Sequence, residues 1–121
     1  MNYIVFDLEW NQNPDGRKHP DSRLPFEIIE IGAVKVVNGE IVDRFSTFVN
    51  PQRPIPLRIT ELTSIDDSMV ADAKSIEEIL PEFLSFCEGC SLVAHNAEFD
   101  VSFIEENAKR QGFTTDFTVL D

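Results

Sequence analysis

Two carboxylates stand two positions apart near the start of the sequence. The stretch YIVFDLEWNQ, residues 3–12, runs from four apolar or aromatic residues into Asp7, Leu8 and Glu9. Alternate side chains of a β-strand share a face, and a rise of ~3.3 Å per residue places the two acidic Cα atoms about 6–7 Å apart. Anions held so close on a mostly buried strand repel unless a cation lies between them or one binds a proton. Oxygen ligands favour Mg²⁺ or Mn²⁺ over zinc, although the pair alone also fits two solvated acids at a strand end.

A third acid stands in the stretch LVAHNAEFD, residues 92–100. This stretch has the pattern of an apolar strand, a His-Asn turn and a helix whose first turn contains Asp100. The positive end of a helix dipole keeps such an acid ionised, so Asp100 is a candidate third ligand. Two adjacent strand ends and a helix start can then supply three carboxylates, Asp7, Glu9 and Asp100, to one metal site.

The elements that position these acids follow from hydrophobic periodicity and turn residues. The predicted strands are 3–8, 27–37, 41–49, 91–95 and 117–120. Asn38-Gly39 indicates a tight hairpin between the second and third strands, which makes them antiparallel neighbours. We expect a loop over 11–25.

Helices are predicted between and after these strands. Three prolines in residues 50–56 exclude regular hydrogen bonding, so this connector leads to a short helical turn over 57–62. Ser75 and Glu78 form a capping-box pattern that opens a helix with apolar residues at helical spacing, and Gly112 ends another helix over 99–111. Strands and helices in this order predict a single α/β domain with a mixed β-sheet and helices packed on it.

Composition limits the function. With 121 residues, 42% of them hydrophobic, the chain can bury one core. Neither a membrane-spanning run nor a signal-peptide pattern is present, so we expect a soluble, cytoplasmic protein without a membrane partner. A net charge of −12 repels long polyanions, so any nucleic acid must be bound locally. Cys87 and Cys90 lack the further ligands of a zinc site and are expected to be ordinary reduced cysteines near a surface.

Four motifs together resemble the DEDD (DnaQ-like) superfamily of 3′-to-5′ exonucleases. They are D-L-E at 7–9, EIIEIGAVKV at 27–36, ITELT at 59–63 and HNAEFD at 95–100. The likeness is closest to bacterial proofreading domains of the PolC and DNA polymerase III epsilon kind. It implies a ribonuclease H-like fold in which four carboxylates hold two Mg²⁺ or Mn²⁺ ions, with Asp7 and Glu9 in the first motif and Asp100 in the second. The implied reaction removes nucleoside 5′-monophosphates from single-stranded 3′ ends of DNA or RNA, with a DNA polymerase as a partner.

The resemblance also implies substrate contacts. Leu62 matches an apolar wedge between the last two bases, and Phe99 matches an aromatic residue beside the second-motif acid. Leu8 and Trp10 belong to the first motif, next to the terminal nucleotide. Trp10 stands where small residues are usual, and it either stacks on a base or faces the core. Phe99 also fits a core position of a helix.

The third motif of the superfamily, H-x-x-x-x-D or Y-x-x-x-D, does not follow in residues 101–121. His95 belongs to the second motif and His19 to a polar loop, so neither is assigned as the base, and Asp121 does not match the fourth ligand. We expect residues 1–121 to be the N-terminal portion of an exonuclease domain that is nearly inactive alone, with its C-terminal part missing. The alternative is a non-catalytic nucleic-acid-binding or assembly module of the same fold without the fourth ligand.

Overall fold

The computed structural model describes residues 2–12, 26–94, 97–113 and 119–120. They contain a five-stranded sheet of order β3-β2-β1-β4-β5. Its strands are β1 (Asn2–Gln12), β2 (Phe26–Val37), β3 (Glu40–Phe48), β4 (Ser91–Ala94) and β5 (Val119–Leu120). The pairs β1–β2 and β2–β3 are antiparallel, whereas β4 is parallel to both β1 and β5. The predicted mixed sheet is therefore confirmed.

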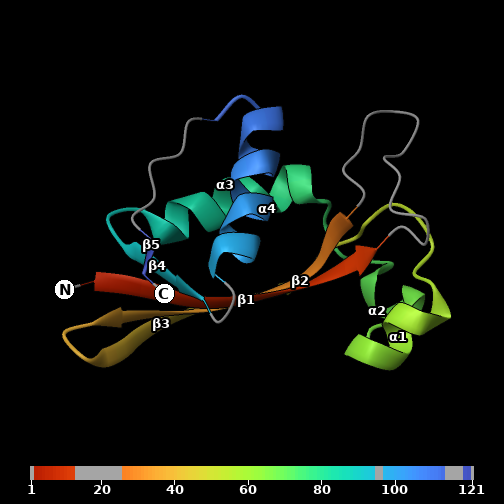
Figure 1. Ribbon diagram of the computed structural model, residues 1–121, viewed down its shortest axis with the longest axis horizontal. Helices are drawn as coiled ribbons and strands as arrows, with labels where there is room; N and C mark the ends of the chain where they lie inside the picture. The colour runs from red at the N-terminus through yellow and green to blue at the C-terminus, as the bar shows by residue number, and fades with distance from the viewer. Residues whose placement is uncertain (1, 13–25, 95–96, 114–118, 121) are drawn as a thin grey trace.

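Helices lie on both sides of this sheet. They are α1 (Leu57–Thr63), α2 (Asp67–Val70), α3 (Ile76–Cys87) and α4 (Ala97–Arg110). Figure 1 shows α3 and α4 on one side, and α1 and α2 together on the other side near one end of the strands. The sequence analysis missed α2, a single turn that begins where the side chain of Asp66 accepts a hydrogen bond from the Met69 amide. No helix in the described ranges is long and apolar enough to cross a membrane.

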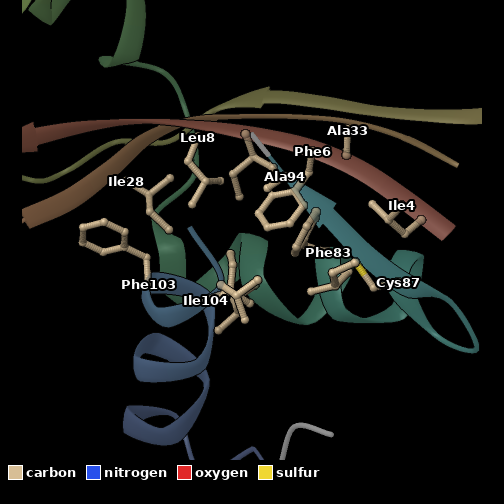
Figure 2. Packing of buried hydrophobic residues seen from close by; sticks show 14 of the residues in the cluster. Ile4, Phe6, Leu8, Ile28, Ala33, Phe83, Cys87, Ala94, Phe103 and Ile104 are labelled. Atoms are coloured by element: carbon tan, nitrogen blue, oxygen red, sulfur yellow. The ribbon is translucent and has the colours of Figure 1, made fainter. Parts of the chain in front are cut away.

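The main core lies between the sheet and helices α3 and α4 (Figure 2). Phe83 of α3 is fully buried there, with its ring centroid 6.0 Å from that of Phe6 and 5.5 Å from that of Phe45. A second cluster on the opposite side anchors the segment that carries α1 and α2. It consists of Ile29, Ile55, Ile59, Ile65 and Val70. Because this cluster includes Ile29 of β2 and Ile59 of α1, it fixes α1 to the sheet.

Strand β1 is longer than predicted. It continues to Gln12, because Asn11 pairs with Glu27 and Gln12 with Phe26 across the antiparallel ladder. Residues 11 and 12 are therefore strand and not loop, and the rest of the expected loop, 13–25, lies outside the described residues. Asp7 and Glu9 are consequently inside the strand, flanked by paired backbone on both sides.

The predicted turns hold, but one helix cap differs. Asn38 and Gly39 have φ angles of 52° and 84°, which confirms the hairpin between β2 and β3. Ser75 is the N-cap residue of α3, yet its side chain forms no capping hydrogen bond. The Glu78 backbone amide donates instead to the Ser75 backbone carbonyl, at 3.1 Å. The predicted start of the helix is therefore confirmed, but the predicted capping-box hydrogen bonds are wrong.

Candidate active site

Asp7 and Glu9 share one face of β1. The intervening Leu8 is 2% exposed and points into the main core with Phe6 (Figure 2), so its neighbours point to the opposite face. Asp7 is exposed and Glu9 is half-buried. The strand therefore presents the acids together, as the period of two predicts. The burial of Leu8 leaves only its backbone for a substrate contact.

Glu30 of β2 is directly opposite Glu9 in the antiparallel ladder. Burial raises the pKa of Glu9, and the negative charges of Asp7 and Glu30 raise it further. Facing residues of an antiparallel pair have Cβ atoms about 4.5–5.5 Å apart, and like charges at this distance destabilise the pair. The sequence analysis missed Glu30, because the register that brings it against Glu9 cannot be read from either strand alone.

Excess negative charge at this place fits a hard divalent cation. The oxygen donors of Asp7, Glu9 and Glu30 are those that Mg²⁺ and Mn²⁺ prefer, and a cation between them would offset the repulsion that raises the Glu9 pKa. Even so, no group of three or more His, Cys, Asp or Glu side chains in the described ranges has the geometry of a metal site. The described residues thus gather negative charge at this place without the ligand geometry of a metal site.

Asp100 lies in the first turn of α4 and is 2% exposed. Strand β4 runs parallel to β1, with Ala94 opposite Phe6, and α4 follows β4 directly, so its first turn starts beside the strand of Asp7. Figure 1 shows α4 extending away from the sheet from this point. The fold therefore brings the second-motif helix to the first-motif strand. The convergence of Asp100 with Asp7 and Glu9 stays a prediction.

The pairing of β1 with β2 shifts register between Glu9 and Trp10. Its side chain packs against the main core, with its ring centroid 5.2 Å from that of Phe103 at an interplanar angle of 32°. Of the two interpretations of Trp10, these contacts favour the core-facing one. Trp10 is two positions after Leu8, so the alternation of the strand places both side chains on the core face.

Asn11 is a second residue whose role the sequence analysis missed. It is 2% exposed, and its Nδ2 donates a hydrogen bond of 3.4 Å to the backbone carbonyl of Pro54. Its Oδ1 accepts no hydrogen bond within the described part of the chain. Asn11 thus ties the end of the acidic strand to the connector that leads into α1. Because the predicted strand ended at residue 8, the sequence placed Asn11 in a polar loop and did not indicate its burial.

Leu62 is 80% exposed on α1, as a wedge between bases requires, and Leu57 on the same helix is 72% exposed. The side chain of Phe99 lies outside the described residues, as do His19 and His95. Cys87 belongs to the main core, and burial raises the pKa of its thiol to about 12. Both Cys87 and Cys90 are free thiols, but the expected surface position is wrong for Cys87, whose apolar surroundings bury it.

Comparisons with known proteins agree with this architecture. The sequence model of the family RNase_T, described as "Exonuclease", matches residues 4–115. The PolC-type DNA polymerase III of Caldanaerobacter subterraneus subsp. tengcongensis is 56% identical over 119 residues, which are 98% of this chain and 8% of that protein. The corresponding protein of Clostridium perfringens is 49% identical over 119 residues, with the same coverage. The chain thus spans about 8% of the length of these relatives.

Solved exonuclease structures share the fold. Exonuclease X in complex with 5′-overhanging duplex DNA is 28% identical, with a TM-score of 0.59 over 93% of this chain and 54% of that one. The nuclease domain of 3′hExo, a DEDDh family member bound to rAMP, is 19% identical, with a TM-score of 0.72 over 93% of this chain and 60% of that one. At that identity the second likeness concerns the fold alone.

Proposed function

We propose that this chain, which belongs to the RNase_T exonuclease family, is a metal-dependent 3′-to-5′ exonuclease domain acting on single-stranded 3′ ends. Family membership confirms the resemblance drawn from the four sequence motifs. The observation that carries the proposal is the placement of Asp7 and Glu9 on one face of β1, with Glu30 facing Glu9 across the ladder. Such a concentration of negative charge is suited to holding a cation at a phosphodiester and poorly suited to binding nucleic acid without one.

Asp7 and Glu9 would hold the cation, and Asp100 would contribute from the start of α4. When bound, Mg²⁺ or Mn²⁺ would lower the pKa of a water nucleophile and stabilise the charge on the phosphate oxygens. Glu30 would keep the local potential negative and so strengthen metal binding. The burial of Leu8 and the core contact of Trp10 anchor the acidic strand, so its acids would be held in place when a substrate binds.

The proposed substrate is a DNA single strand, with RNA as the second polymer to be tested. Two relatives that match 98% of the chain are PolC-type DNA polymerases III, so removal of nucleotides beside a polymerase is the proposed setting. The exposed Leu62 would separate the last two bases. We further propose that residues 1–121 supply the first and second motifs of the domain, and that cleavage by these residues alone is slow because the third motif is not among them.

Metal binding and cleavage can be tested separately. Thermal melts with and without millimolar Mn²⁺ should show stabilisation, by about 2.7 kcal/mol at a hundredfold excess over the dissociation constant, because the ion binds only the folded state. Asp7→Asn should remove the shift. An unchanged melting temperature for the wild type would contradict the metal site.

Cleavage is measured on a 5′-labelled single strand with a free or a blocked 3′ end, and on a circular single strand. We expect shortening from the free 3′ end only, loss of activity in Asp7→Asn, and impaired activity in Leu62→Ala with an unchanged melting temperature. Cuts in the circle would refute an exonuclease. Equal turnover with and without an appended H-x-x-x-x-D or Y-x-x-x-D segment would show that residues 1–121 complete the site.

A further inference from the structure

The outward surface of α1 combines apolar area with one positive charge. Ile59 is 3% exposed and anchors the helix in the second core cluster. The residues on the other side of the helix, Leu57, Arg58, Glu61 and Leu62, are exposed. Arg58 and Leu62 are four positions apart, so their Cβ atoms lie about 5–6 Å apart on one strip of the helix. A shallow hollow beside this strip is lined by Arg58, Ile59, Glu61 and Leu62.

Arg58 forms no ion pair in the part of the chain that the structure describes, whereas three other cations there make ion-pair or ring contacts. Arg53 pairs with Glu27, and Lys74 pairs with Glu82 at 3.2 Å. Lys35 lies over the ring of Phe86, with Nζ 4.8 Å from its centroid. In a protein of net charge −12, a guanidinium left open beside an exposed leucine is a local exception to the surrounding negative potential.

We propose that Arg58 binds a backbone phosphate of the single strand whose bases meet Leu62. The inference rests on the proposed exonuclease function and adds the contact that holds the strand. The planar fork of a guanidinium matches two phosphate oxygens, and a spacing of one helical turn from Leu62 lets one nucleotide reach both side chains. An isolated phosphate contact of this kind binds the strand locally, as the acidic surface requires.

The neighbouring Glu61 provides a variant of opposite sign. It lies three positions after Arg58 and lines the same hollow, so its carboxylate repels a phosphate bound there. Glu61→Gln should therefore tighten binding where Arg58→Gln weakens it. Lys109→Gln, at the end of α4, changes the net charge by the same amount as Arg58→Gln and serves as the matched control.

The test measures binding of a fluorescent ten-nucleotide oligothymidylate with a free 3′ hydroxyl and phosphorothioate terminal linkages that slow cleavage, in millimolar Mn²⁺, from 50 to 300 mM salt. Arg58→Gln should weaken binding several-fold at low salt and reduce the slope of log K against log salt by about 0.7, the value for one contact on a single strand. Lys109→Gln should leave the slope unchanged. The same comparison with oligouridylate tells whether the contact serves DNA, RNA or both. All variants should melt with the wild type, since these side chains are exposed.

An unchanged slope in Arg58→Gln, or an equal change in Lys109→Gln, would overturn the assignment of Arg58 even if the wild type binds and cleaves the strand. If the wild type neither binds the oligonucleotide nor shortens it with Mn²⁺, the proposed function fails first, and the assignment fails with it. The two failures are thus separate results.

Discussion

Glu30 should destabilise the metal-free domain, because it faces Glu9 across the β1–β2 ladder. Glu30→Gln removes one charge while keeping the shape of the side chain and both proposed metal ligands of the strand. Two unit charges 5 Å apart repel by about 0.8 kcal/mol in water and about 3 kcal/mol at an effective dielectric of 20. For half-buried side chains screened by 0.1 M salt, about 1 kcal/mol is expected. In a domain of this size such a change raises the melting temperature by roughly 3–6 °C.

The effect should depend on pH in a defined direction. The Glu9 pKa is raised in the folded state, so ionised Glu9 costs stability as pH rises from the ordinary value of about 4.3 through the raised value. Glu30→Gln removes one cause of this shift. Its advantage should therefore be full at pH 7 and small near pH 3.5, where Glu9, with its raised pKa, is protonated and no longer repels Glu30.

Thermal melts of wild type and Glu30→Gln at both pH values, with and without Mn²⁺, test whether Glu30 repels Glu9. Because the cation offsets the same repulsion, the advantage of the variant should shrink in millimolar Mn²⁺. Glu40→Gln at the exposed start of β3, opposite Val37, is the control for net charge. The reasoning is refuted if Glu30→Gln melts no higher than wild type at pH 7 without metal, or if Glu40→Gln stabilises as much.

Three other outcomes follow from burial and pairing. Arg53→Ala removes the ion pair with Glu27 at a site where the two side chains are 16% and 13% exposed. Denaturant unfolding should show a loss of about 3 kcal/mol. The Arg53→Met, Glu27→Leu double variant should recover most of this loss. Phe83→Ala empties the centre of the main core and should cost about 3–5 kcal/mol by the same measurement, whereas a loss below 1 kcal/mol would contradict the packing. At pH 8 iodoacetamide should label Cys90 before Cys87. The reason is that a pKa of about 12 leaves about one Cys87 thiol in ten thousand ionised. Equal labelling of the two cysteines in the native protein would contradict the burial of Cys87.

Much of the fold was predictable because the signals are local. Alternation along β1 placed Asp7 and Glu9 on one face, and Asn38-Gly39 specified the hairpin through positive φ angles. The periodicity that predicted a helix after Ser75 is confirmed by α3. Each of these features depends on residues within a few positions of one another. The four motifs likewise indicate the exonuclease family, since each is a short run of sequence.

Other features depended on which distant segments meet. Glu30 faces Glu9 only in the observed register, and Asn11 is buried only because the Pro54 connector packs beside it. Trp10 fitted two environments from sequence alone, and its contact with Phe103 places it in the core. The sequence by itself thus determined the family, the paired acids and the order of elements. Tertiary structure decided the register, the burial and the electrostatic neighbours of those acids, since strand pairing brings together groups that no local pattern relates.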